Sequence, residues 1–242
     1  MRKTTFLYLG AAGSLLALFG GLGMQATSAQ IGLPSANLTT AFTGGENMSR
    51  MADELSKALP DLRENVRVAL PYAVLQMAGY ALFSLGFVGI WRLTGRSLGF
   101  IAFIAVLLLG IMTLASFVFL PAAMEDLTDL LREADQAGIP TSMPAALMVV
   151  ALAGVLSLVA QLAGFVSGGY EFYRLGKEFD SDIYRGGGVL LMAAAVATFI
   201  PLIGIFIVVL AIGVTGLSFY LLGRNVDELV GGPDDLPGSP VT

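Results

Sequence analysis

The stretch VLLMAAAVATFIPLIGIFIVVLAIGVTGLSFYLLG, residues 189–223, contains no charged residue and is too long for one membrane crossing. As a single helix it would extend about 50 Å, whereas the hydrocarbon core of a bilayer is roughly 30 Å thick. Pro201 and Gly204 lie where a hairpin of two helices would turn. We therefore predict two spans, at about 185–200 and 202–222, in preference to one long kinked helix.

Other apolar runs precede this stretch and define the rest of the fold. They predict spans at about 71–91, 98–120 and 143–168. Only 13% of the chain is charged and 56% is hydrophobic, whereas about 25% of a soluble domain is charged. The sequence therefore predicts an all-α fold, a polytopic transmembrane helical bundle occupying residues 71–223.

The N-terminal segment, residues 1–29, has two interpretations. A positive start at Arg2 and Lys3, an apolar stretch over 6–24 and the small-residue ending Thr27-Ser28-Ala29 are typical of a secretory signal peptide. The apolar part is also long enough to span a bilayer as a first anchor. The bundle therefore has six spans, or five if this segment is cleaved.

The polar segments between the spans are predicted to form helices at the membrane surface. Segment 30–70 begins as a loop and continues as an amphipathic helix, with a kink expected near Pro60. A second amphipathic helix is predicted at 122–137 and a linker helix at 170–186. The Gly- and Pro-rich tail, residues 224–242, is predicted to be disordered.

Charge and sequons predict the orientation in the membrane. Arginines and lysines concentrate in two short connections, at 92–96 and 170–186, which places these and the C-terminus in the cytoplasm. Residues 30–70 and 121–143 are then extracytoplasmic, although Arg63 and Arg67 beside the second span oppose this. Two N-glycosylation sequons, at Asn37 and Asn47, fall in the outer segment as possible glycosylation sites.

Composition excludes several classes of function. The chain has no cysteine and no histidine, which excludes disulfides, thiolate nucleophiles and the usual zinc and haem ligands. A net charge of −5 argues against nucleic acid as a partner. The apolar runs hold no charged residue, which argues against a pump or a charge-coupled transporter. We predict no catalytic residue, no metal and no cofactor, and we interpret the acidic residues as a solvated surface.

The polar side chains at membrane depth include two glutamines, Gln76 and Gln161. They are predicted to form interhelical hydrogen bonds, with contact to a polar solute as the alternative. Ala160, Gly164 and Gly168 form a stripe of small residues that allows close helix packing. Such packing can lie within one chain or between two copies.

The stretch YEFYRLGKEFDSDIYRGGG, residues 170–188, concentrates seven charges and five aromatic residues. As a helix it would pair Arg174 with Glu171 and Glu178 on its surface. It is predicted to be an interfacial helix, with protein docking or headgroup binding as the alternative. Together with the outer amphipathic helix, it supplies the residues predicted to dock a partner: Met48, Met51, Leu55, Leu59, Phe172 and Phe179.

The sequence YRLGKEFDSDIYRGGGVLLMAAAVATFIPLIGIFIVVLAIG, residues 173–213, resembles the C-terminal part of uncharacterised archaeal multi-pass membrane families. In these, a cytoplasmic linker leads into a hairpin of two spans with an Ile-Pro-x-Ile-Gly-like turn. The resemblance covers this part of the chain alone. It implies a helical bundle and an archaeal source, and it implies no activity.

The sequence thus predicts a non-enzymatic integral membrane protein. We expect a structural, scaffolding or accessory subunit of an envelope or membrane complex, in contact with the lipid bilayer and with a protein partner or a second copy of itself. The alternative is a channel or transporter for a neutral or apolar solute, using Gln76 and Gln161. A membrane enzyme is a third hypothesis, and it would need two carboxylates that converge on one pocket.

Overall fold

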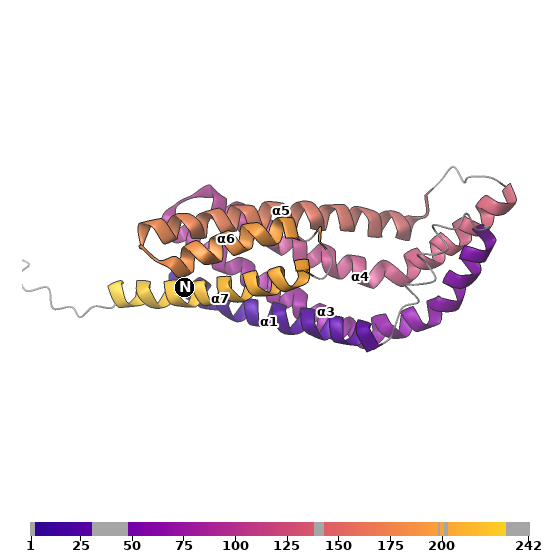
Figure 1. Cartoon of the computed structure of the whole chain (residues 1–242), viewed down its shortest axis with the longest axis horizontal. Coiled ribbons are helices and arrows are strands. Elements are labelled where there is room, and N and C mark those ends of the chain that lie inside the picture. Colours follow the sequence, from indigo (N-terminus) through magenta and orange to yellow (C-terminus); the bar gives the residue numbers. More distant parts are fainter. Residues whose placement is uncertain (1–2, 31–47, 138–142, 198, 201–202, 231–242) are drawn as a thin grey trace, which may run out of the picture. The chain divides into compact units, whose positions relative to one another are not determined.

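The computed structural model describes residues 3–30, 48–137, 143–197, 199–200 and 203–230. The regular secondary structure of these residues is helical throughout (Figure 1). The helices are α1 (Lys3–Gln30), α3 (Met48–Thr94), α4 (Ser97–Ala137), α5 (Ala145–Glu178), α6 (Asp182–Ala197) and α7 (Ile203–Val230). The predicted all-α fold class is confirmed.

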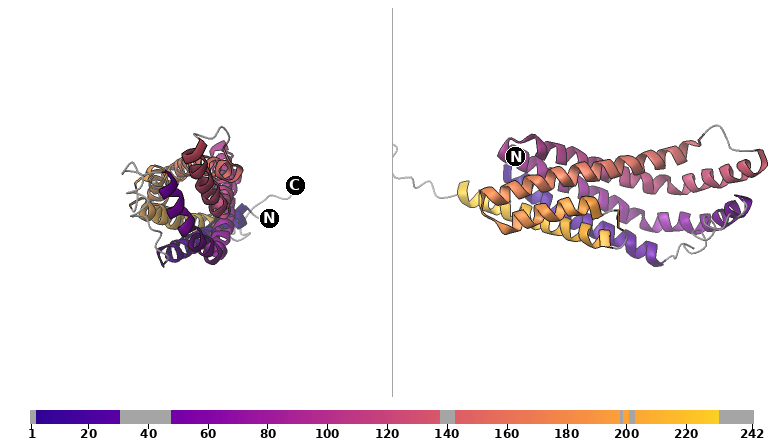
Figure 2. Two further views of the ribbon diagram at one scale, coloured as in Figure 1. Left: turned by 90° about the vertical axis from the view of Figure 1, so that its right-hand side faces the viewer. Right: turned by 45° about the horizontal axis from the view of Figure 1, so that its top comes forward.

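Five of the described helices are long and apolar enough to cross a bilayer. The candidate spans are Thr4–Thr27, Met48–Thr94, Ser97–Ala134, Ala145–Glu178 and Gly204–Asp227. Helix α6 has 16 residues and reaches about 24 Å, less than the roughly 30 Å of a hydrocarbon core. It lies side by side with α7 as a hairpin (Figure 2). The chain is an integral membrane protein.

The helices are longer than the sequence patterns indicated. Helix α3 joins the amphipathic segment to the span at 71–91, α4 joins 98–120 to 122–137, and α5 continues from its span into the linker. Helices α3 and α4 run through Pro71 and Pro121. At the edge of a membrane, leaving the helix would expose backbone groups to lipid at several kcal/mol each, so the helix continues through the proline.

The end of α7 also differs from the prediction. Residues 224–230, predicted to be disordered, are the last turns of this helix. Residues 231–242 lie outside the described part of the chain, as do Asn37 and Asn47, so the structure does not bear on the predicted glycosylation.

The chain divides into two compact units. Unit 1 comprises Met1–Leu15, Ala81–Val106 and Leu162–Thr242, and unit 2 comprises Leu16–Tyr80 and Leu107–Gln161. Helices α1, α3, α4 and α5 each contribute residues to both units.

The core of unit 1 contains a cluster of four buried phenylalanines in contact with one another, which we call the Phe cluster. Phe83 and Phe87 come from α3, Phe172 from α5 and Phe219 from α7. The ring of Phe219 meets the other three edge to face, with centroids 5.0–5.6 Å apart. Such pairs stabilise by about 0.5–1.5 kcal/mol beyond the area that they bury. The cluster therefore holds α3, α5 and α7 together.

Part of the predicted small-residue stripe is used inside unit 1. A Cβ placed on Gly164 would lie 3.0 Å from Val106 Cγ2, and one on Gly168 would lie 2.5 Å from the ring of Phe87. These two glycines therefore allow α5 to approach α4 and α3 within the same chain.

In unit 2, helices α1 and α3 meet at backbone distance. A Cβ added to Gly79 would lie 2.2 Å from the backbone nitrogen of Ala17, and one added to Gly20 would lie 2.4 Å from that of Gln76. No side chain fits there without moving a helix backbone.

Replacing Gly79 with alanine should therefore lower the free energy of unfolding by about 1–3 kcal/mol, the usual cost of overpacking. Gly154 is the matched control, because a Cβ there meets nothing within 4 Å. Unfolding of both variants in mixed detergent micelles, followed by circular dichroism, measures the difference. Equal stability of the two variants would contradict the close contact between α1 and α3.

Candidate functional site

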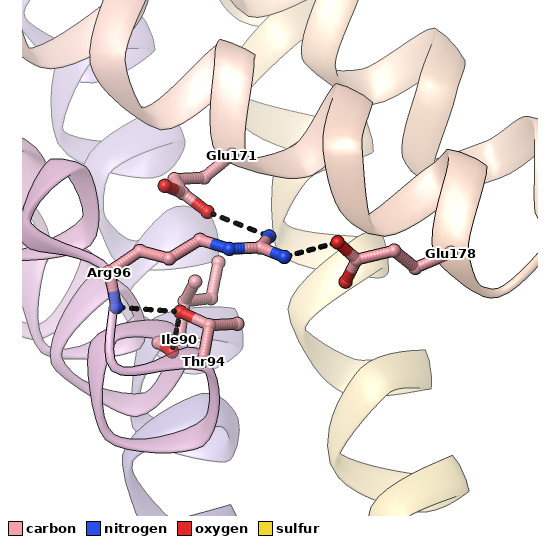
Figure 3. Close-up of polar contacts among 5 residues, drawn as sticks. All are labelled: Ile90, Thr94, Arg96, Glu171 and Glu178. Atoms are coloured by element: carbon pink, nitrogen blue, oxygen red, sulfur yellow. Dashed lines mark hydrogen bonds and ion pairs between the residues drawn. The ribbon is translucent and has the colours of Figure 1, made fainter.

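The turn between α3 and α4 presents a single arginine, Arg96. Gly95 adopts φ +71°, a left-handed conformation that favours glycine, and its N–H donates to the Trp91 carbonyl at 2.7 Å. The Thr94 hydroxyl donates to the Ile90 carbonyl at 2.9 Å and accepts from the Arg96 N–H at 3.3 Å. These bonds fix the backbone from which the arginine side chain projects (Figure 3).

The guanidinium of Arg96 lies between two carboxylates of α5 (Figure 3). Its Nη1 lies 3.5 Å from Glu171 Oε2, and its Nη2 bonds Glu178 Oε1. The hydrogen bond to Glu178 is the main reason that the pKa of Arg96 lies above its ordinary value. Arg96 therefore stays charged and joins the α3–α4 turn to α5.

Glu171 is fully buried, with an exposed fraction of 0%. Among the described residues, its second carboxylate oxygen, Oε1, has no hydrogen-bond partner. A buried carboxylate is costly unless it is paired, so Arg96 supplies the charge that makes this position tolerable.

The expected surface pairs of Arg174 with Glu171 and Glu178 are wrong. In the described part of the chain both carboxylates pair with Arg96. The reason is that α5 does not stop at its span, so its packed face continues into the charged segment. Position 171 follows Gly164 and Gly168 at helical steps of four and three, and this register is a signal that could have predicted its burial.

A second arginine, Arg185, pairs with the two remaining acids of the stretch. Arg185 lies 2.7 Å from Asp180 Oδ1 and 3.4 Å from Asp182 Oδ1. Its Nε also donates to the carbonyl of Gly176 at 3.1 Å. A Cβ on Gly176 would lie 2.5 Å from the backbone nitrogen of Arg185, so this glycine allows α5 and α6 to meet.

Three other cations of unit 1 lie against aromatic rings. Arg174 lies 5.9 Å from the ring centroid of Tyr170, and Lys177 lies 4.7 Å from that of Tyr173. At the end of α3, Arg92 lies 4.6 Å from the ring of Phe6. The four carboxylates of residues 170–188 thus pair with Arg96 and Arg185. Arg174 and Lys177 instead lie over tyrosine rings.

The two glutamines both lie in unit 2 and are half-buried. Gln76 lies within hydrogen-bonding reach of Tyr80, one turn later on α3. Its Nε2 would lie 3.0 Å from a Cβ on Gly21, so its amide packs against α1. Gln161 also has a polar contact. The interhelical hydrogen bonds predicted for the pair stay a prediction.

Unit 1 also contains an apolar groove of about 390 Å³ between α1 and α7. Neither glutamine lines it. Its lining residues are Tyr8, Ala11, Ala12, Ser14, Leu15, Gly213, Gly216, Leu217 and Tyr220.

The residues predicted to dock a partner divide into three groups by burial. Phe172 belongs to the Phe cluster and Leu55 is 3% exposed, so the prediction is wrong for these two, because each faces the core of its unit. Met48 and Phe179 are exposed. Met51 and Leu59 are half-buried.

The four carboxylates of residues 170–188 are in ion pairs with Arg96 and Arg185. The described residues include no group of three or more acidic, histidine or cysteine side chains that could hold a metal ion. Arg96 already pairs with two carboxylates.

Comparison of the chain with protein-family models, with curated proteins and with solved structures found no match. The resemblance to archaeal membrane families stays a prediction.

Proposed function

We propose that this chain is a non-enzymatic structural or accessory subunit of a membrane complex, and that the first half of α5 binds a helix of a partner. The observation that carries the proposal is how little of this helix is packed within the chain. In the most apolar 18-residue stretch of α5, 11% of the residues are buried within the chain. In the corresponding stretch of α3, 56% are buried. Between positions 145 and 161, Ala153 and Ala160 alone are buried.

The exposed residues of this part of α5, which we call the α5 face, are almost entirely apolar. They include Met148, Val149, Leu152, Val155, Leu156 and Val159. Gly154 lies among them, with open space where a Cβ would project. A partner helix could approach closely there, as small residues allow in membranes.

The alternative is a channel or transporter for a neutral or apolar solute. It would need a polar path past Gln76 or Gln161. The packing of Gln76 against α1 and the filling of the unit 1 core by the Phe cluster support the structural role over this alternative.

The proposal can be tested by site-directed photo-crosslinking, because the chain has no cysteine of its own. A single cysteine at Leu152 or Val155, labelled with a benzophenone maleimide in native membranes, should give an adduct with one discrete protein. The matched control is a cysteine at Ala153, which faces the interior and should give none. Adducts with lipid alone from both exposed positions would overturn the proposed function.

A further inference from the structure

Two cations of residues 170–188, Arg174 and Lys177, form no ion pair with a described carboxylate, although acids and bases in this part of the fold are equal in number once Arg96 is included. Glu171 and Glu178 pair with Arg96, and Asp180 and Asp182 pair with Arg185. Within the described ranges, Arg174 and Lys177 take part in no ion pair. Arg174 and Lys177, both exposed on α5, are therefore the two cations of this stretch that contact rings and not carboxylates.

The same two cations are held in position by tyrosine rings. Tyr170 with Arg174 and Tyr173 with Lys177 are successive i,i+4 pairs along α5. A ring face attracts a cation electrostatically but accepts few of its hydrogen bonds, so N–H donors remain for an anion. We call these four residues the Tyr-cation patch.

The patch lies where α5 changes from apolar to charged. The apolar run ends at Gly169, and the exposed Val166 lies one turn before Tyr170. Tyrosine prefers the headgroup level of a membrane. A molecule bound here would meet cations at one end and an apolar helix surface at the other, which is the chemistry of a phospholipid.

We propose that the Tyr-cation patch binds the phosphate of an anionic phospholipid headgroup. Arg174 and Lys177 supply charge and N–H donors to the phosphate, and the acyl chains lie along the exposed apolar surface of α5. The proposal does not depend on the function proposed above, because it concerns the end of α5 in unit 1 rather than the α5 face.

The test uses the full chain reconstituted in nanodiscs of phosphatidylcholine with a minor fraction of phosphatidylglycerol. Native mass spectrometry of the released protein measures how much of each lipid stays bound. Each basic residue near an anionic surface contributes about fivefold in affinity, so Arg174→Gln with Lys177→Gln should lower phosphatidylglycerol retention by roughly tenfold or more.

The matched control is Lys57→Gln with Arg67→Gln, which removes the same charges from exposed surface pairs with Glu54 and Glu64. It should leave retention unchanged. Circular dichroism confirms that each variant is folded. A second variant, Tyr170→Leu with Tyr173→Leu, keeps both charges and should still lower retention, because the cations lose their ring contacts.

Three results would overturn the proposal. Equal losses in the test and control pairs would show that net charge alone attracts the lipid. Equal retention of the two lipids by the unaltered chain would show that the patch does not select anionic headgroups. Displacement of phosphatidylglycerol by free inorganic phosphate would show that the patch is a site for a soluble anion.

Discussion

Replacing Arg96 with methionine should lower the free energy of unfolding by about 3–5 kcal/mol, the usual cost of removing one partner of a buried ion pair. The loss arises because the Glu171 carboxylate, fully buried, would remain in the helix bundle without the cation that faces it. Unfolding in mixed detergent micelles, followed by circular dichroism, measures the change.

Two variants separate this effect from the loss of surface charge. Glu178→Gln removes the half-exposed partner of Arg96 and should cost about 1 kcal/mol or less. Arg96→Met combined with Glu171→Gln should recover most of the lost stability, because the variant no longer buries an unpaired charge. If Arg96→Met costs no more than Glu178→Gln, the Arg96–Glu171 pair does not stabilise the bundle.

Replacing Phe219 with alanine should also cost about 3–5 kcal/mol, because it removes the ring that meets the other three members of the Phe cluster. Phe206 is the matched control, since it lies on the same helix and is 70% exposed. Phe206→Ala should change stability by about 0.5 kcal/mol or less. The same unfolding assay compares the two.

A double-mutant cycle with Phe87 tests whether the rings act as a cluster. Phe87→Ala and Phe219→Ala should be coupled by about 0.5–1.5 kcal/mol, the size of an edge-to-face contact. Additive losses would mean that burial alone, and not ring geometry, accounts for the stability of the unit 1 core.

The fold class could be predicted because it depends on run length and composition, which are local properties. The uncharged run at 189–223 is longer than one membrane crossing needs, which favoured two helices over one long kinked helix. In the structure α6 ends at Ala197 and α7 begins at Ile203, on either side of the predicted turn at Pro201.

Helix boundaries were less predictable. Pro71 and Pro121 are conventional signals for a helix boundary, yet each lies inside a continuous helix. Whether a proline ends a helix depends on the free energy of the non-helical backbone that would replace it. In or near lipid, that backbone would leave polar groups without hydrogen-bond partners, so the helix is favoured despite the proline. Sequence alone does not show which solvent surrounds a given turn.

The candidate site illustrates a further limit. Pairing Glu171 with Arg174 is sound for an isolated helix, where neighbours three residues apart share a surface. Once α5 packs in unit 1, its register turns Glu171 and Phe172 inward and leaves Arg174 outside. The carboxylate then meets Arg96, which is 75 residues away in the chain.

The sequence by itself determined that this chain is a membrane protein of helices, and that its charges gather in short segments such as residues 170–188. The hydrophobicity and length of each run are enough to predict these two features, because each apolar run can be assessed as a membrane span without knowing its contacts with the others. Tertiary structure decided which of those charges are in contact. Arg96 and Arg185 take the four carboxylates, and Arg174 and Lys177 remain on the outer side of α5. That choice depends on helix register and on contacts between distant segments, which local patterns do not contain.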